Sequence, residues 1–310
     1  EASLSVLHNV QNYENATTMG RPGMNKKIVN SYLMADGSRF TDKAGYETMT
    51  FDQECQNRDP RLAQTIRTPG YTRIGSTKKE APNLAYTMTG YHLIKYSMTA
   101  NYDEYNKSCN DIPLFRTAEV YLNFAEAKAE LGTLKQADIN KSIKLLRDRV
   151  GMGNLDMELA NSKPDPYLMS AATGYPNVKG ANQGVILEIR RERTIELAME
   201  GFRYYDIMRW KEGKLFENDL LGIYIPGPGT YDLDQDGTDD VCFYVGTKPA
   251  GNVPLYLEIG EQIRLSNNES GYIICHSLIT KKWNEDRDYL YPVPISERTS
   301  VSYTHLTLPT

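Results

Sequence analysis

The feature that most limits how this chain can fold is a pair of neighbouring helical patterns near its middle. In residues 116–131, and again in residues 135–150, apolar side chains recur at i, i+4, i+7 and i+11. A glycine follows each pattern, as it does at many helix ends. These positions predict two helices that pack antiparallel as a hairpin. The apolar residues are Val120, Phe124, Ala127 and Leu131, then Ile139, Ile143, Leu146 and Val150, and the glycines are Gly132 and Gly151.

The predicted hairpin has the size of one unit of a tetratricopeptide repeat (TPR), which is about 34 residues long. One such unit cannot bury its faces alone, so we expect helical partners elsewhere, some of them upstream of residue 1. A third helix is predicted over residues 184–200. The sequence therefore predicts a mainly α fold, with a TPR-like helical scaffold over residues 111–215.

The regions on either side of this scaffold lack long periodic patterns. Residues 1–110 are rich in Gly, Asn, Asp, Thr and Tyr, and we expect loops with short strands there. Residues 216–300 are rich in turn-forming residues and are predicted to contain a hairpin and irregular structure. We expect the three parts to form one domain over residues 1–300.

The composition argues against several classes of protein. A net charge of −5, with scattered basic residues, gives no electrostatic footprint for nucleic acid. No apolar run approaches the roughly 18 residues of a membrane span. The four cysteines are widely spaced and form no CxxC pair, so no zinc site is predicted, and disulfide pairing stays open. These cysteines are Cys55, Cys109, Cys242 and Cys275.

A ladder of glutamates runs along the third predicted helix, at Glu188, Glu192, Glu196 and Glu200. Four like charges at this spacing repel one another unless something offsets them. One hypothesis is a glycoside hydrolase, in which Glu192 and Glu196 supply carboxyl groups about 5–10 Å apart. The other is a structural ladder paired with arginines, followed by an aromatic segment in which Trp210 anchors the helix in the core. We favour the structural hypothesis, because ion-pair networks of this kind are common.

An aspartate-rich stretch, YDLDQDGTDDV, resembles the start of a calcium-binding loop. Oxygen atoms at alternate positions of such a loop converge on the ion. The glutamate that closes an EF-hand is missing, because Phe243 stands at the twelfth position. Two hypotheses stay open, a calcium-stabilised turn and an acidic hairpin tip exposed to water. The candidate ligands are Asp232, Asp234, Asp236, Thr238 and Asp240.

Four longer motifs together resemble the SusD/RagB family. They are NRDPRL, FRTAEVYLNFAEAKAELG, RRERTIELAMEGFRYYDIMRW and YLYPVPISE, and they occur in the family's order within residues 20–298. The resemblance implies a TPR-like helical scaffold with a loop-rich region packed on it. It also implies a lipid-anchored protein on the outer-membrane surface of Bacteroidota. Such proteins bind glycans or other nutrients, without catalysis, beside a SusC-like TonB-dependent transporter.

The same resemblance bears on the two ends of the chain. The family's signal peptide, lipid-bearing cysteine and first scaffold helices would precede Glu1, so we interpret the chain as a fragment lacking the N-terminal part. Any membrane contact would then be made through that lipid anchor alone. The last ten residues, 301–310, do not resemble the family's ending and are predicted to be a non-native tail.

Glycan recognition calls for aromatic rings on exposed loops, because a ring face suits the apolar face of a sugar. Tyr46, Tyr71 and Tyr175 each follow a glycine in a predicted loop and are the candidate ligand-binding residues. We expect no catalytic residue and no cofactor other than calcium. Two alternatives to glycan delivery remain, namely a TPR-like protein-interaction scaffold without glycan binding and the glycoside hydrolase.

Overall fold

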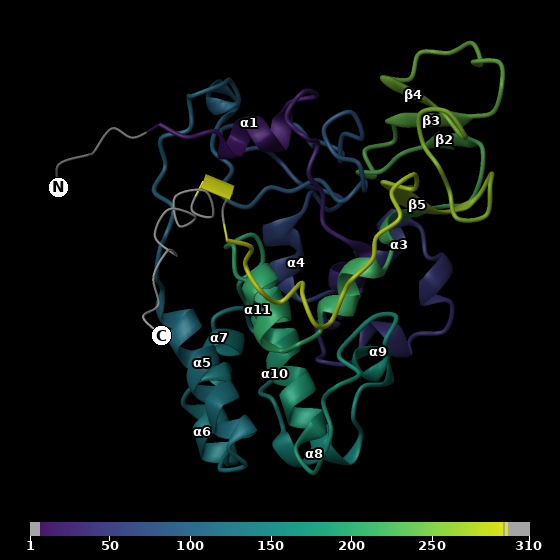
Figure 1. Cartoon of the computed structure of the whole chain (residues 1–310). Coiled ribbons are helices and arrows are strands. Elements are labelled where there is room, and N and C mark those ends of the chain that lie inside the picture. Colours follow the sequence, from purple (N-terminus) through teal and green to yellow (C-terminus); the bar gives the residue numbers. More distant parts are fainter. Residues whose placement is uncertain (1–6, 294, 297–310) are drawn as a thin grey trace.

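A computed structural model of the chain describes residues 7–293 and 295–296. Loops, short helices and small strands fill the upper part of the molecule, and the two longest helices, α5 and α10, stand in the lower part (Figure 1). The α-helices are α1 (Val10–Asn15), α2 (Lys26–Ser31), α3 (Phe51–Glu54), α4 (Pro60–Thr65), α5 (Thr117–Glu130), α6 (Gln136–Asn140), α7 (Ile143–Asp148), α8 (Met157–Ser162), α9 (Pro166–Met169), α10 (Gln183–Glu196) and α11 (Arg203–Arg209). Short 3-10 helices are η1 (Phe40–Asp42), η2 (Tyr46–Thr48), η3 (Ala100–Tyr102) and η4 (Gly213–Glu217).

The strands are few and short, and they form two small sheets. β1 (Leu220–Ile225) pairs antiparallel with β5 (Gly271–Cys275). In the second sheet β3 (Val241–Tyr244) lies between β2 (Gly229–Tyr231), which runs antiparallel to it, and β4 (Leu255–Glu258), which runs parallel. The prediction of a mainly helical fold with few short strands is confirmed.

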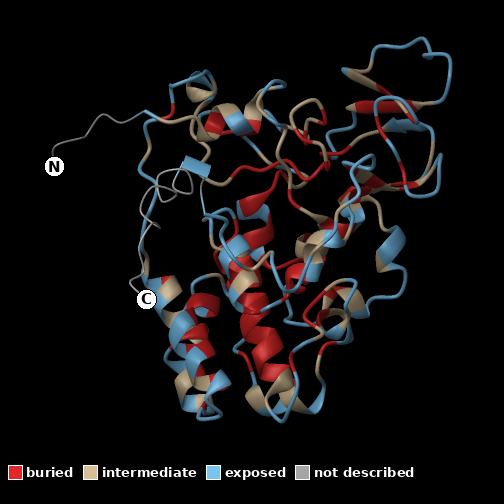
Figure 2. Ribbon diagram, in the orientation of Figure 1, coloured by how far each residue is buried: buried red, intermediate tan, exposed pale blue. Residues whose placement is uncertain are grey.

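Helix α10 is the central element, since every residue from Gly184 to Glu196 is buried. Figure 2 shows it buried along its length, whereas α5 is exposed on its outer side. Its residues Val185 and Leu187 join the apolar core of the scaffold helices, and Ile195 joins the core beneath the loops and sheets. A helix this buried is expected to be apolar all round. The three arginines and three glutamates of α10 therefore need partners of opposite charge.

The predicted hairpin exists, with one interruption. The chain runs down α5, turns at Gly132 and returns through α6 and α7 beside α5 (Figure 1). The second helix, predicted as continuous over 135–150, is broken at Ser142, which has φ −132° and ψ −88°. The buried Ser142 hydroxyl donates to the carbonyl of Asp138 at 2.7 Å, a local bond that competes with the helix. The third helix is found as predicted but ends at Glu196, before the positive φ of Met199 and Gly201.

The prediction that α5 is buried through its stripe of large apolar residues is wrong. Val120, Phe124 and Leu131 are 62%, 41% and 76% exposed. Helix α5 instead buries Leu122 and a row of alanines, Ala118, Ala125 and Ala129. Small side chains let α5 lie close to α10, and this close approach outweighs the larger apolar area on the other side. The larger residues are left as an outward-facing apolar stripe.

The part of residues 1–110 that the structure describes contains no named strand, so the short strands predicted there are wrong. Isolated bridges such as Ile66 with Leu93 take their place. The NRDPRL motif forms α4, because Pro60 stands at its first position and the Asp59 carboxylate accepts from the backbone of Arg61. The predicted non-native tail, 301–310, lies outside the described residues.

The contact between α8 and α10 depends on a glycine. A β-carbon at Gly184 would lie 1.9 Å from the carbonyl oxygen of Ala160 in α8. We expect Gly184→Ala to push the helices apart and lower the free energy of unfolding by about 1–3 kcal/mol, the usual cost of overpacking. Urea denaturation measures this, with Gly153→Ala as the control, because no atom lies within 4 Å of a β-carbon there. Equal stability of the two variants would contradict the prediction.

Candidate functional site

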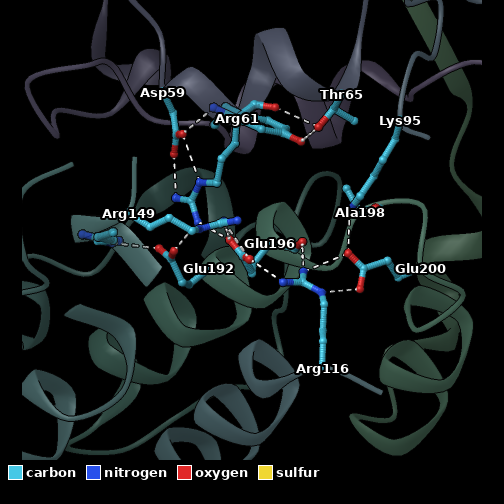
Figure 3. Close-up of polar contacts among 12 residues, drawn as sticks. Asp59, Arg61, Thr65, Lys95, Arg116, Arg149, Glu192, Glu196, Ala198 and Glu200 are labelled. Carbon is cyan, nitrogen blue, oxygen red and sulfur yellow. Dashed lines mark hydrogen bonds and ion pairs between the residues drawn. The ribbon is translucent and has the colours of Figure 1, made fainter. Parts of the chain in front are cut away.

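The glutamate ladder of α10 lies at the junction of the loop region and the scaffold (Figure 3). Glu192 is fully buried between Arg61 of α4 and Arg147 of α7, whose Nε donates to its carboxylate at 2.8 Å. Burial alone would raise the pKa of Glu192, but the two guanidinium groups outweigh it and lower that pKa to about 2. Glu192 is therefore a permanent anion held by two cations.

The other members of the ladder are paired in the same way. Glu196 accepts from Arg116 at 2.7 Å and from Arg149 at 2.8 Å, and Arg61 also reaches it at 3.1 Å. Glu200 pairs with Arg116 and Lys95, and Glu188 pairs with Arg191. The prediction that Glu192 or Glu196 is paired to an arginine is confirmed. Glu192 and Glu196, the carboxyl groups of the hydrolase hypothesis, have side chains that are 0% and 1% exposed and are paired with arginines.

Trp210 is 7% exposed and lies in the scaffold core, as predicted. Its ring meets Tyr175 edge-on with the ring centroids 5.3 Å apart, and the Arg190 guanidinium lies 4.5 Å from its centroid. The indole Nε1 donates to the carboxylate of Glu126 at 2.6 Å. These contacts tie α11 to α5 and α10.

The three tyrosines proposed as ligand contacts lie in different surroundings. Tyr175 is 3% exposed and its hydroxyl accepts from Arg203 at 2.7 Å, so the expectation that it is an exposed loop residue is wrong. The preceding Gly174 lets the loop close down, because a β-carbon there would lie 2.1 Å from the carbonyl oxygen of Leu168. Tyr46 and Tyr71 are half-buried.

Tyr46 belongs to a small aromatic group with the buried Phe40 and with Tyr167 of α9. Its ring centroid lies 5.8 Å from that of Phe40 and 6.5 Å from that of Tyr167, both edge-on. Tyr71 lies apart from this group, with the guanidinium of Arg67 5.4 Å from its ring centroid. The structure gives no contact between Tyr46 and Tyr71, so they do not form one continuous platform.

The aspartate-rich stretch is the tip of a hairpin, joining β2 to β3 as predicted. Carboxylate oxygens of Asp232, Asp234 and Asp240 lie within 4.8 Å of one another, and Asp234 is 2% exposed. Burial, followed by the charges of the other two, raises the pKa of Asp240 to about 6. Oxygen ligands at this spacing suit a hard divalent cation such as Ca²⁺.

Of the five residues proposed as calcium ligands, the structure thus brings three carboxylates together. Asp236 lies outside this group, and its carboxylate accepts from the backbone of Thr238 at 2.8 Å. Asp232 also accepts from the backbone N–H of Gly237 at 2.8 Å, which curls the loop around the carboxylates. Elsewhere in the described residues no group of three or more His, Cys, Asp or Glu side chains meets in this way. The four cysteines are free thiols.

Within the described residues, no helix combines the length and apolar character needed to cross a bilayer.

Comparison with known proteins gives one family and solved structures that are SusD-like. The SusD family model matches residues 6–304. A SusD-like carbohydrate binding protein from Bacteroides fragilis is 23% identical, with a TM-score of 0.57 over 89% of this chain and 46% of its own. A second SusD-like protein from the same species is 22% identical, with a TM-score of 0.58 over 96% of this chain and 49% of its own. This chain spans about half the length of those structures. None of the curated protein sequences matches it significantly.

Proposed function

This chain belongs to the SusD family, and from that premise we propose that it binds glycans and delivers oligosaccharides to a SusC-like TonB-dependent transporter. The family match over residues 6–304 is the observation that carries the proposal. Two further points support it: a relative of the same fold is described as carbohydrate binding, and the ladder carboxylates are all ion-paired. The proposed function is binding without catalysis.

We place the protein on the outer-membrane surface, held by an N-terminal lipid anchor. The scaffold of α5 to α11 would act as the TPR-like frame, and the loop region would carry the ligand. Tyr46, on η2 beside Tyr167, and Tyr71 are the proposed aromatic contacts. Neither is fully buried, and each lies in the loop-rich segment, so a sugar can reach them from solvent.

The test of this function is binding to polysaccharide. Affinity gel electrophoresis against a panel of polysaccharides is expected to show retardation, and calorimetry with a ladder of oligosaccharides is expected to show tighter binding with length. Tyr46→Ala is expected to weaken binding by an order of magnitude, about 1.4 kcal/mol. Tyr105→Ala is the control, because Tyr105 is a 64% exposed tyrosine of another loop. No retardation by any polysaccharide would contradict glycan binding.

A protein-interaction scaffold is the second candidate, and the outward-facing stripe of α5 favours it. Val120 and Leu131 are more than 60% exposed on a well-formed helix, and contiguous exposed apolar surface commonly marks a binding surface. This role is compatible with glycan delivery, because the transporter would be such a partner. Loss of transporter binding in Val120→Ser/Leu131→Ser, with glycan binding unchanged, would support both roles.

We also propose that the hairpin tip of Asp232, Asp234 and Asp240 binds calcium. A ligand of the native state raises stability by about 2.7 kcal/mol at a concentration 100 times its Kd. Calcium is therefore expected to raise the melting temperature relative to chelator by several degrees. Because the pKa of Asp240 is raised to about 6, protons compete with the cation, and the rise is expected to shrink from pH 8 to pH 5.

The control for this experiment lies in the same loop. Asp234→Asn removes a ligand from the carboxylate group and is expected to abolish the calcium effect, whereas Asp236→Asn is expected to retain most of it. An identical melting temperature with calcium and with chelator at pH 8 would leave only the hydrated hairpin tip.

A further inference from the structure

Helix α1 lies in the upper part of the molecule (Figure 1), and its two buried side chains, those of Gln11 and Glu14, are both polar. The Oε1 of Gln11 accepts from Arg73 at 2.9 Å, and the Oδ1 of Asn15 accepts from Arg67 at 2.8 Å. A helix of six residues is not stable by itself in water. Helix α1 therefore stays folded only while such polar contacts hold it against the loop region.

Glu14 is the buried residue of α1 whose contacts are incomplete, although it is only 2% exposed. Its Oε2 accepts from the hydroxyl of Ser97 at 3.2 Å, whereas its Oε1 is buried and has no hydrogen-bond partner among the described residues. A carboxylate anion in this position would lose its water and gain a single donor, which costs far more than burying the neutral acid. The contacts therefore fit a Glu14 that carries a proton.

The charged groups around Glu14 do not offset its burial. Burial is the largest effect and raises the pKa of Glu14 to about 8, although Arg73 and Arg67 act in the opposite direction. Both arginines are already paired, Arg73 with Asp103 and Arg67 with Glu80 at 3.1 Å. Asp103 itself adds to the rise, because a second negative charge nearby disfavours the anion.

Two histidines also touch α1. His92 is fully buried, its Nε2 lies 2.8 Å from the backbone carbonyl oxygen of Glu14, and its Nδ1 accepts from the backbone N–H of Asn83 at 3.1 Å. Nδ1 can accept only while it carries no proton, so the ring is neutral, and burial lowers the pKa of His92 to about 3. His8 contacts the start of α1, where its Nδ1 accepts from the backbone of Val10 at 3.3 Å.

We propose that α1 is a proton-dependent latch, a helix that stays docked on the loop region while Glu14 holds a proton and is released when that proton passes to water. Undocking would place Glu14 in water, where its carboxyl group has an ordinary pKa of 4.5. Because the docked state has the higher pKa, it binds more protons between pH 4.5 and pH 8. Docking is therefore strongest below pH 4.5, weakens as the pH rises through this interval, and is weakest above pH 8.

Release of α1 also changes the surroundings of Tyr71. Arg67, which donates to Asn15 of α1, has its guanidinium 5.4 Å from the centroid of the Tyr71 ring. Undocking removes Asn15 and leaves Arg67 with one acceptor fewer. The latch is thus connected to one of the proposed glycan contacts. The inference nevertheless goes beyond the proposed function, because the docking of α1 is measured without any glycan.

Hydrogen–deuterium exchange of the backbone amides of residues 10–15 measures the docking of α1 in the full chain. The wild type is compared from pH 5 to pH 7.5 with Glu14→Gln, which resembles the protonated acid and has no acidic proton to lose. Glu14→Met, a side chain of similar length that also has no acidic proton, takes its place if Glu14→Gln does not fold. The matched control is Glu104→Gln, because the Glu104 side chain is 79% exposed and lies 3.9 Å from its cation, Lys107.

Exchange is first corrected for the intrinsic rate at each pH. Opening of α1 is then expected to increase by about tenfold per pH unit in the wild type relative to Glu14→Gln, because each opening releases one proton. Glu104→Gln is expected to follow the wild type, and any effect of His8 cancels because all the proteins retain it. The same pH dependence in the wild type and Glu14→Gln would overturn the latch. Amides of α1 that exchange at the intrinsic rate in both proteins would overturn it too, since α1 would then not be docked.

Discussion

Replacing Glu192 with alanine is expected to lower the free energy of unfolding by about 3–5 kcal/mol, the usual cost of breaking a buried ion pair. The variant would leave Arg61 and Arg147 buried with one carboxylate fewer between them, and each guanidinium is at most 4–5% exposed. Urea denaturation followed by circular dichroism measures the loss. Glu130→Ala is the matched control, because Glu130 is half exposed and only 3.7 Å from its nearest cation, Arg190.

Glu192 is also expected to change how the free energy of unfolding depends on pH. Because the folded pKa of Glu192 is about 2, against 4.5 for an ordinary glutamate, the carboxylate contributes stability above pH 4.5. That contribution is lost as the pH falls from 4.5 toward 2. The wild type is therefore expected to lose more stability over this interval than Glu192→Gln does. Parallel losses in the two proteins would show that the ion pairs do not act as described.

Replacing Trp210 with alanine is expected to cost about 3–5 kcal/mol, as large aromatic truncations in cores do. The change removes the packing against Tyr175 and Arg190 and leaves Glu126 with one donor fewer. Trp210→Phe separates the two losses, because it keeps a ring but removes the Nε1 hydrogen bond, and about 1–2 kcal/mol is expected. Chemical denaturation measures both variants.

The control for Trp210 lies in the same helix, α11, at whose C-terminal end Trp210 stands. Tyr205→Ala removes an aromatic ring from α11 that is 60% exposed, and a change within about 0.5 kcal/mol is expected. If Trp210→Ala lowers the free energy of unfolding no more than Tyr205→Ala does, Trp210 does not hold α11 against α5 and α10.

Periodicity was enough to predict where α5, the segment of α6 and α7, and α10 lie, because a helical pattern is local in sequence. It did not predict which side of α5 is buried. The large apolar residues Val120, Phe124 and Leu131 were predicted to be buried. The residues that are buried are instead Leu122 and the alanines that fit closely against α10. The size of the gap between two helices is set by both of them, so one helix read alone does not reveal it.

The candidate site was predictable to a similar extent. That the ladder glutamates need arginines follows from their spacing, but the partners Arg61, Arg116 and Arg147 lie in distant segments and carry no local signal. The cluster of carboxylates in the aspartate-rich loop was predictable because these residues are close together in sequence. Tyr175 was misplaced because burial of a loop residue depends on the closure at Gly174.

The partners of α10 also constrain the order in which the chain can fold. The Arg61–Glu192 pair spans 131 residues, the Arg116–Glu196 pair spans 80, and the Arg147–Glu192 pair spans 45. Removing these glutamates from water before the arginines arrive would carry the full cost of burying a bare charge. During synthesis all three arginines leave the ribosome before α10 does. They therefore cannot form their ion pairs until α10 has been made. Helix α10 is therefore expected to become ordered late and together with its partners, in a slow step set by these long separations.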